Sequence, residues 1–270
     1  MKLSVTTLGW PVATLETILK DIQQTGGFAG IDFRGLGEAM DITTLPAFNA
    51  DLDQTMARVR AAGLTVSGLS TSVRLINNDK GERAAGEAVS FCRLADRMGV
   101  SFVRIFGGPP RQGQSRDQWM AEGIDNLQRG LDATAGCRAL LCLETHDAWC
   151  HSADVAELLD KVNNPRAAAL WDICITALYG KETPATSVAN LGKRIRYTHM
   201  KDGTAIDAKG QMLLTLPGKG NVDMVGAVKE LKKLNYDGWL TFEWEKRWHP
   251  ELPDAPVALP AYRNLIGPLA

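Results

Sequence analysis

Four ionisable residues follow four apolar stretches in the second half of the chain. They are Glu144 in "LCLETH", Asp172 in "LWDIC", His199 in "YTHMKD" and Glu243 in "LTFEWE". If the fold gathers these stretch ends, the empty cluster is unstable, because like carboxylates repel and burial disfavours their charged form. A divalent cation would remove both objections. Three carboxylates and one imidazole suit a hard to borderline ion, so Mn²⁺ is the first choice, with Mg²⁺, Co²⁺ and Zn²⁺ as alternatives.

The elements that must position these residues are short apolar runs that alternate with helical patterns. Helical spacing is seen, for example, in residues 51–63 and 222–238, each of which ends in a glycine. Such alternation predicts a parallel sheet with helical crossovers. The candidate strands are residues 2–9, 30–35, 64–71, 102–108, 140–146, 168–174, 195–202 and 239–245.

Eight strand and helix repeats predict a closed barrel, and 270 residues suit one. We therefore predict a single (β/α)8 TIM barrel, with residues 1–270 as one domain. An open doubly wound sheet is the rival fold, but its dinucleotide fingerprint is incomplete, because "GLGEAM" has Met40 in the place of the last glycine. In a barrel, the active site lies at the C-terminal ends of the strands, where the four ionisable residues stand.

Composition and missing motifs restrict the class of protein. The net charge of -1 argues against a nucleic-acid partner, and the longest apolar runs are shorter than a membrane span. Five cysteines without CxxC spacing do not form a disulfide framework, which favours the reducing cytoplasm. The chain has no GxSxG, P-loop or HExxH motif, so acyl transfer, nucleotide hydrolysis and zinc proteolysis have no support.

Several segments together resemble the sugar phosphate isomerase/epimerase family of xylose isomerase-like TIM barrels. These segments are "LETHD", "LWDI", "YTHMKDG", "PGKG" and "LTFEWEKRWHPE". The resemblance implies that Glu144, Asp172, His199 and Glu243 hold one divalent metal. It also implies that Glu144 and Glu243 are the catalytic residues that exchange a proton with the substrate.

One position departs from the family pattern. Family members commonly have a histidine three residues after the metal-binding aspartate, and this chain has Ile175 there. The departure predicts the absence of a second metal, and it prevents the direct transfer of a named epimerase activity.

The predicted reaction is isomerisation or epimerisation of a small sugar or keto-sugar. The metal would polarise the carbonyl, one glutamate would remove the neighbouring proton, and the other would return a proton to the resulting enediolate. A β-leaving group would turn the same chemistry into a lyase or dehydratase reaction. The predicted partner is a small carbohydrate, and a homo-oligomer is a further expectation.

Other polar and aromatic residues near the strand ends are candidates for holding the substrate. Lys201 and His146 could donate to a hydroxyl or oxyanion, and Arg34 and Arg104 could anchor hydroxyls, a carboxylate or a phosphate. The alternative for His146 is a bond to a neighbouring loop, and for Arg104 a core ion pair. The predicted substrate-binding residues are His146, Lys201, Arg34, Arg104, Glu245 and Trp248.

Two other classes of protein are alternatives to a sugar-converting enzyme. An endonuclease IV-like nuclease needs further histidine ligands and a basic surface, whereas this chain has four histidines. A binding or regulatory protein on an inactive barrel is the other class. The segment "PGKG", residues 217–220, could bind a phosphate through its backbone amides or form a simple turn.

Overall fold

The computed structural model describes residues 1–76, 82–207 and 210–270, and eight parallel strands form a closed barrel within them. Around the barrel the strands follow the order β1-β10-β7-β6-β5-β4-β3-β2. The predicted single (β/α)8 barrel is therefore confirmed. The assignment of residues 1–270 to one domain stays a prediction. The barrel strands are β1 (Lys2–Thr6), β2 (Gly30–Phe33), β3 (Thr65–Arg74), β4 (Phe102–Phe106), β5 (Leu140–Glu144), β6 (Ala167–Asp172), β7 (Ile195–Met200) and β10 (Trp239–Phe242).

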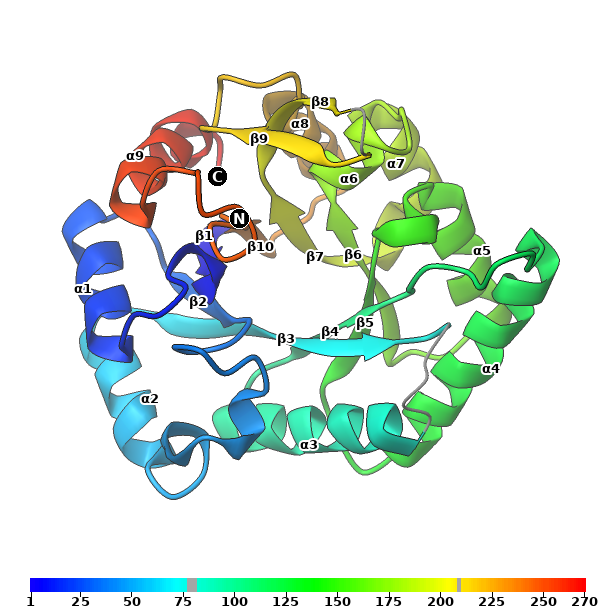
Figure 1. The fold of residues 1–270 in the computed structure, drawn as a ribbon, viewed down its shortest axis with the longest axis horizontal. Helices are drawn as coiled ribbons and strands as arrows, with labels where there is room; N and C mark the ends of the chain where they lie inside the picture. Colours follow the sequence, from blue (N-terminus) through cyan, green and yellow to red (C-terminus); the bar gives the residue numbers. More distant parts are fainter. Residues whose placement is uncertain (77–81, 208–209) are drawn as a thin grey trace.

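Helices surround the barrel, as Figure 1 shows. Their apolar faces explain their position: in α8, for example, Met224, Val228 and Leu231 are all buried. The helices are α1 (Leu15–Thr25), α2 (Leu52–Ala61), α3 (Glu82–Met98), α4 (Arg116–Ala133), α5 (Ser152–Val162), α6 (Ile173–Leu178), α7 (Pro184–Leu191), α8 (Met224–Lys233) and α9 (Ala255–Ile266). Short 3-10 turns are η1 (Thr7–Gly9), η2 (Ile42–Thr44), η3 (Pro46–Phe48), η4 (Asp147–Trp149), η5 (Gly192–Arg194) and η6 (Gly267–Leu269).

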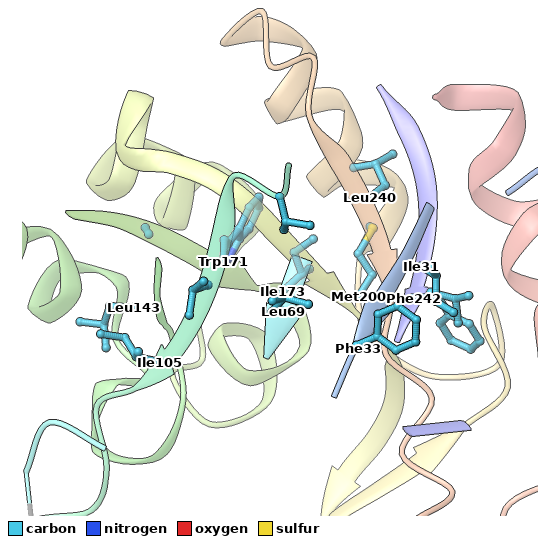
Figure 2. Close-up of a cluster of buried hydrophobic side chains, with 14 of the residues drawn as sticks. Ile31, Phe33, Leu69, Ile105, Leu143, Trp171, Ile173, Met200, Leu240 and Phe242 are labelled. Atoms are coloured by element: carbon cyan, nitrogen blue, oxygen red, sulfur yellow. The ribbon is translucent and has the colours of Figure 1, made fainter. Parts of the chain in front are cut away.

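Alternation along each strand separates an apolar outer layer from a polar barrel interior. Figure 2 shows part of the outer layer, a cluster of buried side chains from several strands that includes Trp171, Met200 and Phe242. Their strand neighbours Asp172 and His199 are buried as well, but they belong to the opposite face. The period of two therefore turns Asp172 and His199 into the barrel, because their strand neighbours face the helices.

The register of the parallel strands sets the level at which these groups meet. Asp172 on β6 pairs with His199 on β7, and His199 pairs with Thr241 on β10, two residues before Glu243. Neighbouring strands thus present ionisable side chains near one end of the barrel.

A small antiparallel hairpin follows β7, and the sequence interpretation did not foresee it. It consists of β8 (Asp202–Ile206) and β9 (Met212–Thr215). Figure 1 shows the two strands at one edge of the barrel, beside α6 and α8. The hairpin also makes the candidate strand 195–202 too long, because β7 ends at Met200 and β8 begins at Asp202.

Candidate active site

Three predicted ligands meet inside the barrel mouth. One ligand atom from each of Glu144, His199 and Glu243 lies within 4.8 Å of the other two. His199 Nδ1 is 2.8 Å from Glu144 Oε1 and 3.3 Å from Glu243 Oε1. All three side chains are buried, so two carboxylates share one imidazole nitrogen in a site shielded from water.

The charges in this cluster hold the acids ionised. Burial opposes ionisation of Glu144, but Arg104 and His199 lower the pKa of Glu144 to about 2. Burial likewise opposes a charged imidazole, but Glu243 and Glu144 raise the pKa of His199 well above its usual range. The cluster therefore attracts positive charge strongly.

Asp172, the fourth predicted ligand, has other partners in this structure. Its Oδ1 accepts hydrogen bonds from the backbone N–H groups of Cys174 and Ile175, which caps the N-terminus of α6. Its Oδ2 accepts a hydrogen bond from Lys201. The role of Asp172 as a metal ligand stays a prediction.

Lys201 lies among three carboxylates. Its Nζ forms ion pairs with Asp172 Oδ2, with Glu243 Oε2 at 2.5 Å and with Glu245 Oε1 at 2.9 Å. The side chain is fully buried, and although burial opposes its charge, Asp172 and the two glutamates raise the pKa of Lys201 well above its usual range. Glu243 and Glu245 are two residues apart, and both reach the same ammonium group.

The donor set of the cluster fits a divalent cation. Two carboxylates and an imidazole are the ligand types that Mn²⁺, Zn²⁺ and related ions take. Glu144 Oε2 is buried and, within the described residues, has the Arg104 ion pair at 3.2 Å but no hydrogen bond of good geometry, so it can still bind an ion. Glu144, His199 and Glu243 are the residues that could hold the ion.

The two arginines that the sequence singled out lie beside the cluster. Arg104 Nη1 is 3.2 Å from Glu144 Oε2, and the Arg104 guanidinium lies over the Phe106 ring at 3.7 Å. Arg34 Nη2 donates to Ser72 Oγ at 3.1 Å. Burial and the charge of Arg104 together lower the pKa of Arg34 to about 9, which indicates that the two like charges are near each other.

The remaining predicted substrate residues lie toward the rim. His146 is 29% exposed, with its ring 4.9 Å from that of Phe106 and its Nδ1 3.2 Å from Asp147 Oδ1. Trp248 is 51% exposed, next to Arg247. Substrate contacts by His146, Trp248 and Glu245 stay predictions.

The "PGKG" segment binds a carboxylate of the chain itself. The backbone N–H groups of Gly218 and Gly220 donate to Asp202 Oδ2 at 2.8 and 2.9 Å. These amides are therefore engaged by Asp202, and the turn interpretation describes them better than a phosphate site.

Sequence reasoning missed a buried polar chain below the cluster. Asp32 Oδ2 lies 3.9 Å from His199 Nε2 and accepts a hydrogen bond from the Tyr197 hydroxyl at 2.9 Å, while Asp32 Oδ1 accepts one from Ser70 at 3.0 Å. A Cβ at Gly68 would be 2.5 Å from Asp32 Oδ2, so the glycine leaves room for this carboxylate. An aspartate inside the apolar run "GIDF" was the available signal.

Comparison with known proteins places this chain in a family. The model of the xylose isomerase-like TIM barrel family matches residues 19–264, so the chain belongs to that family. The resemblance inferred from the motifs is confirmed. No match to a curated protein sequence was found.

Solved structures with the same fold include several enzymes. An IolI protein with a bound zinc atom is 16% identical, with a TM-score of 0.83 over 100% of this chain and 98% of that chain. The probable 3-DHS dehydratase AsbF from Bacillus anthracis is 17% identical, with a TM-score of 0.78 over 98% of each chain. The 3-keto-D-glucoside 4-epimerase YcjR from E. coli is 14% identical, with a TM-score of 0.75 over 100% of both chains. At these identities the similarity establishes the fold.

Within residues 1–76, 82–207 and 210–270, every helix is too short or too polar to cross a bilayer.

Proposed function

We propose that this protein is a divalent-metal-dependent isomerase or epimerase of a small sugar or keto-sugar. The observation that carries the proposal is the pair of buried carboxylates, Glu144 and Glu243, at 2.8 and 3.3 Å from His199 Nδ1. Two acids at one metal-binding cluster allow one to remove a proton and the other to return it. Solved structures of the same fold that are named as sugar epimerases support the proposal.

A cation held by Glu144, His199 and Glu243, with Asp172 as the predicted fourth ligand, would supply positive charge beside a substrate carbonyl and so acidify the neighbouring C–H. Mn²⁺ is the ion we propose first, for the oxygen-rich donor set. Because position 175 is an isoleucine, we propose a single ion at this site.

The chain's own residues would then move the proton. Glu144 or Glu243 accepts it from the carbon next to the carbonyl. The other glutamate, which must carry a proton of its own for this step, delivers that proton to the opposite face for epimerisation, or to the adjacent carbon for isomerisation. Lys201, whose ammonium lies 2.5 Å from Glu243, is placed to donate to a substrate oxygen.

Substrate positioning falls to the residues around this core. Glu245 holds Lys201 from the rim side at 2.9 Å, and His146 and Trp248 are exposed enough to contact a sugar. Arg34 and Arg104 supply buried donors that have no hydrogen-bond partner among the described residues. We propose a cytoplasmic setting with no nucleic-acid partner, in line with the free cysteines and the balanced net charge.

A lyase or dehydratase is the second candidate function. Lys201 places a proton donor beside the proton acceptor Glu243, which is the pairing that loss of water from a β-position needs. Incubation with keto-sugars in D₂O separates the candidates. Deuterium incorporation without loss of water supports the isomerase or epimerase, and net dehydration supports the lyase.

The proposal is tested by replacing Glu243 with glutamine. Glu243→Gln should abolish turnover and weaken Mn²⁺ binding, because it removes a proton acceptor and a charged ligand. Glu230→Gln on α8 is the matched control, since Glu230 pairs with Lys233 on the same helix, outside the site. Full activity and unchanged Mn²⁺ binding of Glu243→Gln would refute the assignment.

A further inference from the structure

We propose that the substrate carries an anionic group, a carboxylate or a phosphate, and that Arg34 and Arg104 bind it. This inference rests on the proposed function and names the class of substrate. It starts from the donors of these two buried arginines that have no acceptor.

Arg34 is held at the end of β2 with an incomplete set of partners. Its backbone N–H donates to Thr7 Oγ1 at 3.0 Å, and its Nη2 donates to Ser72 Oγ at 3.1 Å. Its Nη1 is buried and has no hydrogen-bond partner among the described residues. Arg34 is only 7% exposed, yet its guanidinium makes no ion pair with any of the described residues.

Arg104 is even more buried, at 2% exposure, and its donors are also incompletely used. Within the described residues its Nε and Nη1 make no hydrogen bond of good geometry, although Nη1 is 3.2 Å from Glu144 Oε2. The Phe106 ring covers one face of the guanidinium and Thr71 fixes its backbone carbonyl, so the side chain is held in place. A fixed fork of donors is the geometry that binds a carboxylate or phosphate with two bonds.

The charge balance changes once the metal cluster is filled. Glu144 and Glu243 are the nearby acids that favour the charged form of Arg34 most, followed by Glu87. When the same glutamates neutralise a divalent cation, they no longer offset the two guanidiniums. The arginine side of the mouth is then left with excess buried positive charge.

A neutral sugar hydroxyl could accept one hydrogen bond but would not offset that charge. Buried charges are generally paired, because isolation from water costs several kcal/mol per ion. An anionic substituent satisfies both the orphan donors and the charge. A carboxylate and a phosphate share this chemistry, so the experiment must distinguish them.

The test measures binding of two small anions to the Mn²⁺-loaded protein by calorimetry. The probes are inorganic phosphate and glycolate, a small hydroxy carboxylate. We expect at least one probe to bind, and Arg34→Gln and Arg104→Gln to weaken that binding at least tenfold. The probe that binds more tightly identifies the anionic group.

Three comparisons keep the result unambiguous. Arg34→Lys keeps the positive charge but lacks the two-pronged guanidinium, so its affinity for the probe should lie between those of wild type and Arg34→Gln. This variant also controls for misfolding of Arg34→Gln. Arg116→Gln, a surface arginine paired with Asp154 and Glu157, should bind the probe like wild type. Retained Mn²⁺ binding by Arg34→Gln shows that the cluster itself is intact.

Two outcomes would overturn the inference. One is binding of neither probe, and the other is equal binding by wild type and both glutamine variants, which would mean that the anion contacts the cation alone. Either result leaves the proposed function standing if Mn²⁺ binding and proton exchange on a neutral keto-sugar are observed. Failure of Mn²⁺ binding in wild type would refute the proposed function instead.

Discussion

The two sides of the barrel mouth treat buried charge differently. On the lysine side, which consists of Asp172, Lys201, Glu243 and Glu245, one ammonium touches three carboxylates. On the arginine side, which consists of Arg34 and Arg104, the two guanidiniums have one ion pair and several donors without acceptors in the part of the chain that the structure describes.

The difference separates stability from binding. A buried charge with a full set of partners is costly to disturb, because removal of one partner leaves the others desolvated. A buried donor without an acceptor is already unfavourable, so its presence points to a ligand. The lysine side therefore contributes more to stability, and the arginine side has more donors left for a substrate.

The largest expected effect is on the lysine side. Lys201→Met leaves three buried carboxylates without their cation, so the free energy of unfolding of the metal-free protein should fall by about 3–5 kcal/mol. Urea denaturation measures this change. Lys161→Met is the control, because Lys161 forms an exposed i,i+4 pair with Glu157 and should lose only about 0.5 kcal/mol. A loss below about 1 kcal/mol in Lys201→Met would break the comparison.

Metal addition should give the next largest effect. With Mn²⁺ at a hundred times its dissociation constant, the folded state gains about 2.7 kcal/mol, because the ion binds the assembled cluster and not the unfolded chain. Thermal denaturation with and without Mn²⁺ measures this gain. Glu144→Gln should remove most of it. An equal gain in that variant would place the ion elsewhere.

Asp32 should affect metal binding without contacting the metal. Asp32→Asn removes the carboxylate nearest to His199 Nε2. In the wild type, we expect this carboxylate to favour the tautomer that has its proton on Nε2 and a free lone pair on Nδ1. Mn²⁺ affinity should fall roughly tenfold or more, the effect typical of such supporting groups. Calorimetry measures the affinity, and nitrogen NMR of His199 reports the tautomer. Ser70→Ala, which removes one hydrogen bond from Asp32, should have a smaller effect.

The smallest change in stability is expected on the arginine side. Arg34→Gln loses one hydrogen bond to Ser72 but also removes a buried charge, so the free energy of unfolding should change by less than about 1 kcal/mol. Urea denaturation of the metal-free protein measures it. A loss as large as that of Lys201→Met would show that both sides are structural, and would remove the contrast between them.

Much of the fold could be predicted because its signals are local. Alternating apolar residues identified all eight barrel strands, and helical spacing in residues 51–63 and 222–238 identified α2 and α8. The β8–β9 hairpin escaped because its strands are short and only partly apolar, so periodicity gave a weak signal. The bounds of the strands were also too wide where apolar letters continued into a loop.

Within the site, the sequence identified which residue types stand at the strand ends, and Glu144, His199 and Glu243 do meet. It could not show that Asp172 and Glu245 share Lys201, or that Asp32 reaches His199. These contacts join residues that are tens to more than a hundred positions apart. Side-chain period and strand order determine which face a residue occupies, and they were readable from the chain. Barrel closure and register determine which charges become neighbours, and only the tertiary structure decided them.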